Sequence, residues 1–502
     1  MELFKLLVFL CSLIYYKVKT FNQEKYFNAQ DILYQSVMTE LEEDEHYSEL
    51  QEILKSTLKD KQSNDVCRKK IIIVGAGISG LISALTLKKN GCKVKILEAS
   101  NRIGGRIYSK KYWNSTFEFG AWQFPTSHKL INILINHTKL PKRLLRQDNH
   151  NNYFYIDKRV IKLDTILQHG NEYSNKFLKS AEIVKLILKP LLNEINRIGW
   201  RKFVKIYDRY STKDIFLRKI NRETFEYLKK FIWLNTFEDR SIIQYLRTYA
   251  LRRKTMKYYQ IIGGNDKLVK YLSRELIEEI QLESNVLGIR KFFNKFLITT
   301  NQSKSAICCQ RIEYLADHVI VTVSGTASKY INFDRQFSKQ VEPIRSLSYV
   351  KEARIAIKCR YPIWHDIGIT GGLSRLENHT FVVYPSDSLS TEFYVKMLYY
   401  HDNFHKKEFI VKSFRELREI HGNSFTKYCT KYIIHVWENE IYQKSAFGLF
   451  KPGQEVIQKQ ILSMNGNLWF GGEHTSEIRG WVEGALISGL RIAKRILDIY
   501  DQ

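Results

Sequence analysis

The chain has 502 residues, 44% of them hydrophobic and 26% charged, which is ordinary usage for a globular protein of about three domain-sized units. Its 25 glycines and 7 prolines are too few for a collagen-like or low-complexity chain. The formal net charge of +27 would attract anionic membranes or glycans. The basic residues are scattered and no nucleic-acid-binding motif accompanies them, so we expect no specific nucleic-acid partner.

An apolar run, Leu6–Tyr16, lies near the N-terminus. It is too short to span a bilayer, which needs about 20 residues, but it suits the core of a signal peptide. We therefore expect residues 1–20 to be a signal peptide and the protein to be secreted, with an uncleaved anchor as the alternative. Sequons for N-glycosylation agree with this route. They begin at Asn114, Asn136, Asn301 and Asn378.

The first elements after this run are a helix and a β-α-β unit. Apolar residues recur on one face of Tyr47–Lys59, which predicts a helix there. Lys70–Val74 reads as a fully buried strand, Ile78–Asn90 as a helix, and Val94–Leu97 as a second strand. Because the two strands flank one helix, we expect them to be parallel neighbours.

The rest of the chain alternates between helical and strand-rich stretches. Residues 150–257 are rich in Leu, Ile, Lys and Tyr and almost free of Gly, which predicts a helical insertion. Strand patterns return at 258–335 and include a buried strand within Asp317–Val323. Residues 336–440 alternate in a way that indicates an antiparallel sheet. Leu468–Asp498 reads as a strand, a Gly-rich turn and an amphipathic helix.

A dinucleotide fingerprint joins the first strand to its helix. Gly75 permits the tight turn, Gly77 lets the backbone approach a pyrophosphate, and Gly80 lets the helix pack close to the strand. The helix N-terminus presents free N–H groups to the phosphates. Glu98 ends the second strand about 20 residues further on, where a carboxylate can accept hydrogen bonds from a ribose. The sequence therefore predicts a dinucleotide cofactor.

The segment Glu98–Arg106, with its Gly-Gly-Arg loop, resembles the flavin-dependent amine oxidase superfamily. Further blocks continue the resemblance in the family's order. They are Gly120–Pro125, Gly263–Asp266, Gly368–Gly372, Gly471–Glu473 and Arg479–Ala485. Within the superfamily, the chain is most similar to secreted L-amino-acid oxidases of the venom and mucus type, through Ser346–Tyr349, Ile363–Trp364 and Val383–Pro385.

The resemblance implies a mixed α/β (α+β) fold, in which a doubly wound FAD-binding domain is interleaved with a sheet-based substrate domain and a helical insertion. The expected segments are a signal peptide (1–20), an N-terminal helical segment (21–67), a first FAD-binding part (68–149), the helical insertion (150–257), a second FAD-binding part (258–335), the substrate-binding domain (336–440) and a third FAD-binding part (441–502).

The resemblance also implies the chemistry. FAD would take a hydride from the α-carbon of an amino acid or amine, and O₂ would reoxidise the flavin and yield hydrogen peroxide. A homodimer is a further expectation. Trp481 would wall the substrate site, and the Tyr384 hydroxyl would donate to the substrate carboxylate. The residues expected to contact FAD are Gly75, Gly77, Ile78, Ser79, Gly80, Glu98, Ala99, Gly105, Arg106, Gly120, Ala121, Trp122, Gln123, Val286, Glu473, Gly480, Trp481, Val482, Glu483, Gly484 and Ala485.

The cysteines give one expected disulfide. Cys359 and Cys429 match a pair that is bridged in the resembled subfamily. Cys92 lies beside a helix cap and reads as a buried, unpaired small hydrophobe. No Cys-x-x-Cys or His/Cys cluster has the spacing of metal ligands, so we expect no metal.

The chain departs from the resembled subfamily at three points. Gln123 stands where that subfamily has an arginine for the substrate carboxylate, and an amide cannot supply the charge or the two-pronged geometry of a guanidinium. Arg354 stands where the superfamily has a lysine that holds a water near the flavin. Phe231–Phe237 contains no histidine, although a candidate active-site base is expected there.

These departures leave three main hypotheses open, beside any other flavin oxidation. The protein is an L-amino-acid oxidase with altered preference, an amine or polyamine oxidase, or a secreted FAD-binding homologue with weak or no catalysis. In the two oxidase readings the catalytic candidates are Arg354, Tyr384, Trp481 and Gln123.

Overall fold

The structure is a computed structural model. It describes residues 23–59, 67–145, 152–162, 172–231, 234–251, 257–303, 309–377, 380–386, 390–399, 404–463 and 466–500. The expected signal peptide (1–20) and the sequon at Asn378 lie outside these residues. Among the described helices, none combines the length and the apolar character that a membrane crossing requires.

A parallel five-stranded sheet forms the centre of the first lobe, in the order β10-β2-β1-β14-β22. Its strands are β1 (Lys70–Val74), β2 (Lys93–Leu97), β10 (Ile280–Gln281), β14 (His318–Val321) and β22 (Leu468–Phe470). They come from well-separated stretches of the chain. The expected parallel pairing of β1 and β2 is confirmed, with Lys70 opposite Lys93, and the doubly wound lobe is confirmed with it.

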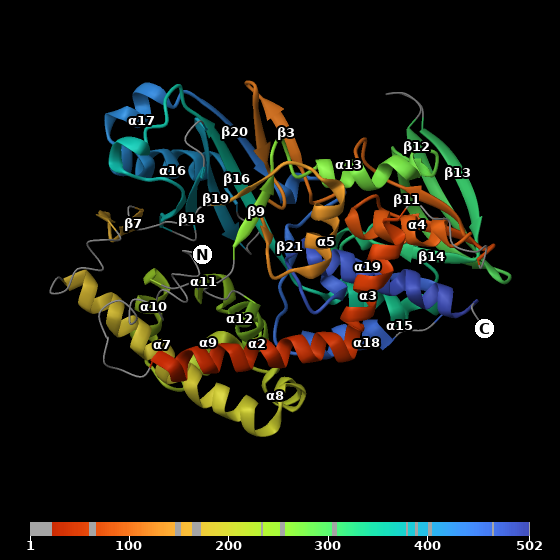
Figure 1. Ribbon diagram of the computed structural model, residues 1–502, viewed down its shortest axis with the longest axis horizontal. Helices are drawn as coiled ribbons and strands as arrows, with labels where there is room; N and C mark the ends of the chain where they lie inside the picture. The colour runs from red at the N-terminus through yellow and green to blue at the C-terminus, as the bar shows by residue number, and fades with distance from the viewer. Residues whose placement is uncertain are drawn as a thin grey trace.

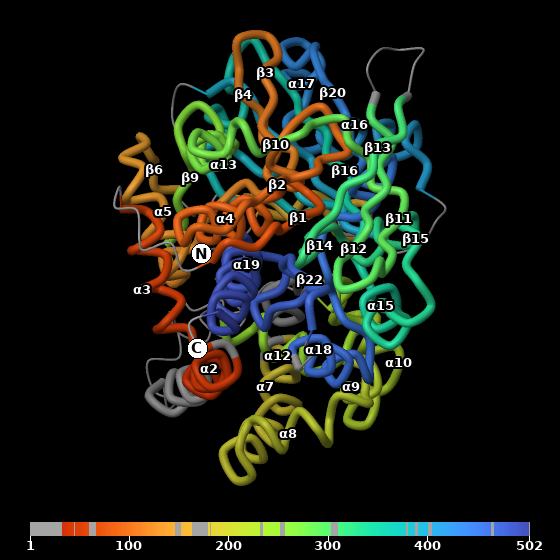
Figure 2. Tube along the Cα trace, turned by 90° about the vertical axis from the view of Figure 1, so that its right-hand side faces the viewer, coloured from red at the N-terminus to blue at the C-terminus, as the bar shows by residue number. Residues whose placement is uncertain are grey.

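Both faces of this sheet are covered, so successive residues of β1 are buried in different cores. Ile71 and Ile73 belong to the core that includes helices α4 (Ile78–Lys89) and α19 (Val482–Asp498). Ile72 and Val74 belong to the core beneath a four-stranded sheet. That sheet has the order β13-β12-β11-β15. In Figure 2, α4 and α19 lie on one side of β1, β14 and β22, and β12 and β13 lie on the other.

The remaining elements of the first lobe are short. The four-stranded sheet consists of β11 (Ser284–Phe292), β12 (Lys295–Ser303), β13 (Cys309–Ala316) and β15 (Asn332–Phe333). The helices beside it are α14 (Gly325–Ser328), α15 (Ser338–Ser346) and α18 (Gln454–Ser463). Helices α3 (Tyr47–Thr57), α5 (Lys129–Thr138) and α13 (Lys267–Ser273) contact α4 or α19. The helix expected at Tyr47–Lys59 is therefore confirmed, to within its last residues.

A second, antiparallel sheet forms the other lobe, in the order β20-β16-β19-β18-β17-β7-β8, with β21 also paired to β16. Its strands are β16 (Tyr349–Lys358), β17 (Gly372–Arg375), β18 (Thr380–Tyr384), β19 (Glu392–Tyr399), β20 (Lys431–Val436), β21 (Phe447–Gly448), β7 (Tyr153–Ile156) and β8 (Arg159–Lys162). Helices α16 (Lys406–His421) and α17 (Asn423–Tyr428) pack against it (Figure 1). The antiparallel sheet predicted for residues 336–440 is confirmed.

In the segment 150–257, the described helices begin at Glu172. Its helices are α7 (Glu172–Ile198), α8 (Trp200–Tyr207), α9 (Thr212–Leu217), α10 (Arg222–Phe231), α11 (Leu234–Phe237) and α12 (Ile242–Leu251). The prediction is wrong for the hairpin β7–β8, which extends the antiparallel sheet through a single bridge, Phe154 to Arg375. The pairing partner is remote in sequence, so composition alone could not reveal it. Helix α2 (Gln23–Glu45) lies along the helical segment (Figure 1).

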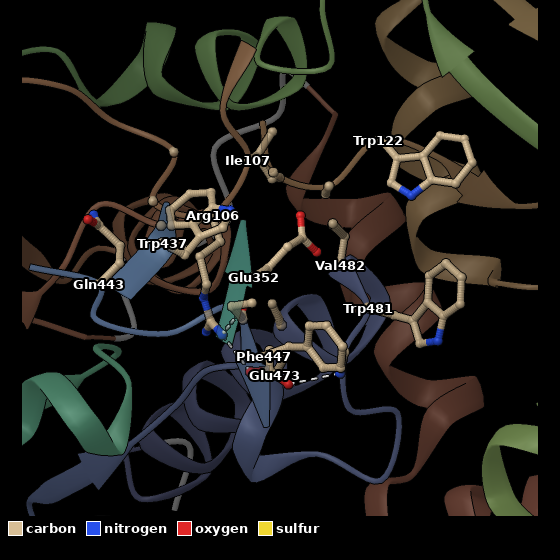
Figure 3. Close-up of a pocket in the computed structure, with 18 of the residues that line it drawn as sticks. Arg106, Ile107, Trp122, Glu352, Trp437, Gln443, Phe447, Glu473, Trp481 and Val482 are labelled. Atoms are coloured by element: carbon tan, nitrogen blue, oxygen red, sulfur yellow. Dashed lines mark hydrogen bonds and ion pairs between the residues drawn. The ribbon is translucent and has the colours of Figure 1, made fainter. Parts of the chain in front are cut away.

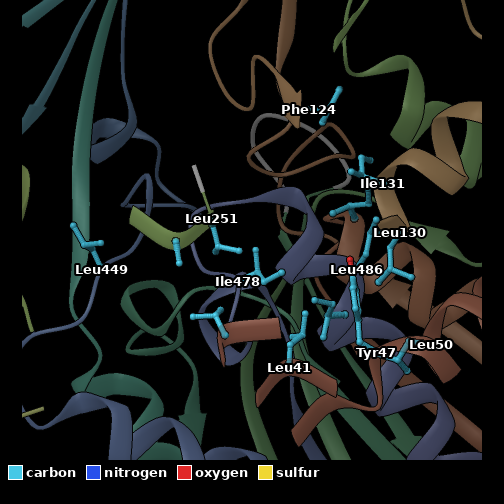
Figure 4. Packing of buried hydrophobic residues seen from close by; sticks show 14 of the residues in the cluster. Leu41, Tyr47, Leu50, Phe124, Leu130, Ile131, Leu251, Leu449, Ile478 and Leu486 are labelled. Atoms are coloured by element: carbon cyan, nitrogen blue, oxygen red, sulfur yellow. The ribbon is translucent and has the colours of Figure 1, made fainter. Parts of the chain in front are cut away.

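Two smaller sheets complete the fold near the junction of the lobes. One is the hairpin of β3 (Ser109–Tyr112) and β4 (Ser115–Glu118). The other has the order β5-β9-β6, formed by β5 (Phe124–Pro125), β9 (Tyr258–Ile261) and β6 (Lys142–Leu144). Figure 4 shows the nearby core, where Tyr47, Leu130 and Leu486 bring α3, α5 and α19 together.

The structure contains two disulfides. Cys359–Cys429 is the expected one. The second joins Cys67 to Cys92, so the expectation that Cys92 is unpaired is wrong. Cys67 lies just before β1 and Cys92 just before β2, and because these strands are parallel neighbours, their N-terminal approaches lie side by side.

A buried ion network ties α2 to the rest of the molecule. The Arg247 guanidinium contacts Glu40 at 2.9 Å, Glu455 at 2.7 Å and Glu477 at 2.6 Å. Glu40, Asp44 and Glu477 lie close enough together to hold an ion. Arg247 and Lys459 already supply positive charge to these carboxylates. The cluster therefore needs no metal to be neutralised, and the expected absence of a metal stays a prediction.

Candidate active site

A cavity of about 580 Å³ lies between the parallel sheet, the antiparallel sheet and the helical segment. This volume is in the range of cofactor and substrate pockets. One end is formed by the Gly-rich turn after β1, and the other by β16, β18, β19 and the β5-β9-β6 sheet. The cavity therefore connects the dinucleotide fingerprint to side chains from the antiparallel sheet, the helical segment and the β5-β9-β6 sheet.

The fingerprint glycines have the geometry that a dinucleotide requires. Gly75 has φ +108°, which few residues other than glycine adopt. A Cβ on Gly77 would meet nothing within 4 Å, so its backbone is open to the cavity. A Cβ on Gly80 would lie 2.1 Å from the Gly75 carbonyl oxygen. Gly80 thus serves helix packing and does not line the cavity.

Glu98 lies at the end of β2 on the cavity wall. One carboxylate oxygen accepts from the Ala76 N–H at 2.7 Å, and the other accepts from Ser100 N–H at 2.9 Å and Ser100 Oγ at 2.6 Å. These bonds fix its orientation beside the glycine turn. Each carboxylate oxygen has two lone pairs, so Glu98 retains acceptor capacity for a ribose.

A partly buried ion pair lies on the cavity wall. Arg106 donates to Glu473 at 2.7 Å (Figure 3). Glu473 also accepts from the backbone N–H groups of Gly448 and Gly480 at 3.0 and 2.9 Å. Burial alone would raise the pKa of Glu473, but Arg106 and these N–H groups outweigh burial and hold the pKa below its usual value. Arg106 is thereby fixed on the cavity wall, and it is the residue that would neutralise the charge of a bound pyrophosphate.

Aromatic rings form one wall of the opposite end. Tyr258 stacks on Trp481 with ring centroids 6.4 Å apart, and His128 packs edge-on against Trp481 at 5.1 Å. Trp122 and Trp481 lie on the same side of the cavity (Figure 3). Burial lowers the pKa of His128 to about 3, so this ring is neutral. Among the described residues, no histidine lines the cavity.

The floor of this end carries a charged triad from two neighbouring strands. Glu352 and Arg354 are two residues apart on β16 and so lie on one face, and Lys396 of β19 is opposite Arg354. Glu352 accepts from Arg354 Nη2 at 2.5 Å and from Lys396 Nζ at 2.7 Å. Burial would raise the pKa of Glu352, but the two cations outweigh burial and lower it. Figure 3 shows the Glu352 carboxylate directed into the cavity.

Arg354 is also held from the other side. Its Nη1 donates to the Glu118 carbonyl oxygen at 2.5 Å, and its side chain is buried. The guanidinium is thus fixed by a carboxylate and a carbonyl on the cavity wall. Sequence reasoning identified Arg354 but missed Glu352 and Lys396. The two-residue spacing of Glu352 and Arg354 on a buried strand was the available signal.

Tyr384 lies on the cavity wall, but its hydroxyl already has a partner. Tyr384 Oη lies 2.9 Å from His421 Nε2. Burial raises the pKa of Tyr384 and lowers that of His421 to about 4, so both groups are neutral. A substrate carboxylate would have to share this hydroxyl with His421.

The sequence matches the family model described as "Flavin containing amine oxidoreductase" over residues 78–497. The chain belongs to this flavin amine oxidase family. It is 25% identical to an L-amino-acid oxidase of Echis ocellatus, over 90% of this chain and 92% of that protein. It is 27% identical to an L-amino-acid oxidase of Daboia russelii, over 90% of this chain and 93% of that protein. It is 24% identical to an L-amino-acid oxidase of Siganus canaliculatus, over 88% of this chain and 88% of that protein.

Solved structures of flavin amine oxidases share the fold. A cyclohexylamine oxidase from Brevibacterium oxydans IH-35A aligns with a TM-score of 0.70 and 17% identity, over 87% of this chain and 100% of that one. A putrescine oxidase bound to putrescine aligns with a TM-score of 0.68 and 17% identity, over 86% and 99%. The expected fold class is therefore confirmed.

The cavity fits FAD, the cofactor of this flavin amine oxidase family. The open backbone at Gly77, the N-terminus of α4 and the acceptor Glu98 form a cradle at one end. All the expected cofactor and catalytic residues line the cavity except Gly80, Glu483 and Gly484. A Cβ on Gly484 would lie 2.1 Å from the Ile478 carbonyl oxygen, so this glycine serves packing.

Glu483 lies outside the cavity, where it caps another helix. Its carboxylate accepts from the backbone N–H groups of Leu130 and Ile131, each at 2.8 Å, and from the Tyr47 hydroxyl. These N–H groups begin helix α5, whose N-cap residue His128 makes no side-chain cap bond. Glu483 was expected to contact FAD, but it does not line the cavity. Successive residues in the first turn of α19 point in different directions, so Val482 lines the cavity and Glu483 does not.

Proposed function

We propose that the protein is an FAD-dependent oxidase that deaminates an L-amino acid, with O₂ as oxidant, to a keto acid, ammonia and hydrogen peroxide. The similarity to L-amino-acid oxidases over nine-tenths of the chain carries this proposal. The bound flavin would accept a hydride from the substrate α-carbon and pass electrons to O₂. The protein would position the substrate and exclude water.

The cavity residues support these two tasks. Trp122, Trp481 and Tyr258 offer flat apolar surfaces against which a substrate side chain can pack. Glu352 and Arg354 form an ion pair, so neither needs a substrate charge to stabilise it. Arg106 and Glu473 place a fixed guanidinium beside the cofactor end. The site is thus organised before any ligand binds, which reduces the entropy lost on binding.

A specific observation favours an amine or polyamine oxidase as the second candidate. Gln123 carries no charge for a substrate carboxylate, and the buried Glu352 carboxylate faces the cavity (Figure 3). Because Glu352 is already neutralised by Arg354 and Lys396, this candidate rests on the uncharged Gln123. The third candidate, an FAD-binding homologue with weak or no catalysis, draws support from the fixed Arg354 at the position where the family has a lysine.

A peroxide assay with an absorbance spectrum separates the candidates. The purified protein would be offered L-amino acids, monoamines and polyamines in turn. Flavin bands with peroxide from L-amino acids support the proposal. Flavin bands with peroxide only from amines favour the second candidate, and flavin bands without peroxide favour the third. A colourless protein contradicts all three.

Secretion and glycosylation are further proposals. The apolar run Leu6–Tyr16 supports export, and Asn114 is exposed in the turn between β3 and β4, where a glycan could attach. Expression in secreting cells, with analysis of the medium and of the mobility shift after glycosidase treatment, tests both. Size-exclusion chromatography tests the proposed homodimer, and binding to anionic vesicles tests the expected adhesion to anionic surfaces.

A further inference from the structure

Three polar side chains form a row across the β5-β9-β6 sheet. Gln260 of β9 is opposite Arg143 of β6. On the other side of β9, Phe124 is opposite Tyr259 and Pro125 is opposite Tyr258. Extending this antiparallel register by one residue places Gln123 opposite Gln260. The row is therefore Gln123, Gln260 and Arg143.

The whole row faces the substrate end of the cavity. Gln123, Gln260 and Arg143 all line the cavity. Tyr258 lies two residues before Gln260 on β9, hence on the same face, and it stacks on Trp481. The polar row and the aromatic wall are therefore parts of one surface. Gln123 Oε1 is buried there, and no described residue donates a hydrogen bond to it.

The Arg143 guanidinium is fixed over the central strand. Its Nε and Nη2 both donate to Gln260 Oε1, at 3.0 and 2.7 Å. Two bonds to one acceptor set the plane of the guanidinium. Because β9 lies between β6 and β5, Gln260 holds the guanidinium on the strand that pairs with both. Lys142, the preceding residue, points to the outer face and donates to Asn136 at 2.6 Å.

We propose that Arg143 supplies the positive charge that recognises the substrate carboxylate, with Gln260 positioning it and Gln123 adding a neutral hydrogen bond. The inference rests on the proposed function, because it assumes a substrate that carries a carboxylate. Arg143 then replaces, from β6, the guanidinium that Gln123 no longer provides next to β5. The substrate class is an α-amino acid whose side chain packs on Trp481 and Tyr258.

The test compares Arg143→Gln with Lys142→Gln in the FAD-loaded enzyme. Each variant removes one positive charge from β6, but only Arg143 faces the cavity. L-phenylalanine and phenethylamine serve as substrates, because they differ only in the carboxylate. We expect Arg143→Gln to raise KM for L-phenylalanine about 10- to 100-fold, as the loss of a charge-assisted hydrogen bond implies. KM for phenethylamine should stay within about twofold, and Lys142→Gln should leave both values unchanged.

A binding measurement accompanies the kinetics. Benzoate carries a carboxylate and a ring but no amine, and its Kd is read from the shift of the flavin absorbance bands. Arg143→Gln should weaken benzoate binding by a similar factor, and Arg143→Lys should restore part of it. The absorbance ratio of flavin to protein and the melting temperature report whether each variant keeps its cofactor and its fold.

Each outcome decides the inference. It is overturned if Arg143→Gln leaves KM for L-phenylalanine and Kd for benzoate unchanged, while the proposed function still stands. It is also overturned if KM rises equally for both substrates. If the parent enzyme oxidises only phenethylamine, the proposed function fails, and benzoate then decides: weaker binding to Arg143→Gln supports the carboxylate site, and no binding to the parent overturns it.

Discussion

Gln123 shows how a single neutral side chain changes what the cavity can recognise. It lies on the cavity wall, immediately before β5, with a buried amide oxygen that lacks a donor among the described residues. An arginine here would place a second guanidinium beside Arg143. A carboxylate could then be held by two cations from strands on either side of β9.

Gln123→Arg should therefore lower KM for L-amino acids by about tenfold, since a charged hydrogen bond replaces a neutral one. FAD occupancy, measured by flavin absorbance, should change little. Steady-state peroxide assays give KM. An unchanged or higher KM would show that the substrate carboxylate does not bind near Gln123.

Arg354 keeps a positive charge near the expected flavin but is held rigidly by Glu352 and the Glu118 carbonyl. A lysine is more compact and makes fewer fixed bonds, so Arg354→Lys would leave room for a water beside Glu352. We expect faster reoxidation of the reduced flavin by O₂ in this variant. Stopped-flow absorbance measures that rate. A rate no faster than the parent's removes Arg354 from the oxygen reaction.

Helix α5 depends on a carboxylate from a distant helix. Its first N–H groups are satisfied by the Tyr47 hydroxyl, which accepts from Lys129 at 3.0 Å, and by Glu483, which accepts from Leu130 and Ile131. Glu483 therefore joins α3, α5 and α19 at one buried point. The neighbouring apolar residues in Figure 4 pack around this point.

Glu483→Ala should lower the free energy of unfolding by roughly 2–4 kcal/mol, because it leaves two buried N–H groups without acceptors. Urea denaturation measures the loss. Glu49→Ala is the control, since Glu49 is exposed on α3 and contributes little. The flavin content of folded Glu483→Ala should match that of the parent. A loss of flavin with unchanged stability would instead make Glu483 a cofactor contact.

Stability of the whole molecule should depend on pH through two opposing sets of buried groups. Burial raises the pKa of Glu118, Glu416 and Glu483 to about 7. Folded carboxyls of this kind keep protons that the unfolded chain has released, so stability falls as pH rises toward 7. Burial also lowers the pKa of several histidines, whose effect has the opposite sign below about pH 6.5. These are His128, at about 3, and His318, His421, His435 and His474, at about 4.

Between about pH 6.5 and 8, each of these carboxyls should lower the free energy of unfolding by about 1 kcal/mol as it loses its proton in the folded state. The histidines, which are still partly protonated in the unfolded chain at about pH 6.5, offset part of this fall. Urea denaturation at both pH values measures this fall. Glu118→Gln should reduce it, because glutamine mimics the protonated acid, and the partly exposed Glu313→Gln should not. The same pH dependence in Glu118→Gln as in the parent would contradict the prediction.

Local motifs predicted which residues line one end of the cavity, because these residues follow one another along the chain. Gly75, Gly77 and Glu98 lie where the fingerprint expects them. The residues that line the other end of the cavity were harder to predict. Lys396 and Arg143 reach the cavity through strand pairing, which sequence periodicity does not specify. The Cys67–Cys92 disulfide was missed for the same reason.

The parallel sheet has a consequence for how the protein is made. Strand β22 forms one edge of the sheet beside β14, and helix α19 packs on α4 next to the glycine turn. Both are made long after β1 and α4, so a nascent polypeptide cannot complete the sheet or cover the glycine turn until these late segments have been synthesised. A chain truncated before Leu468 would lack both segments, and we expect its absorbance spectrum to show no flavin bands.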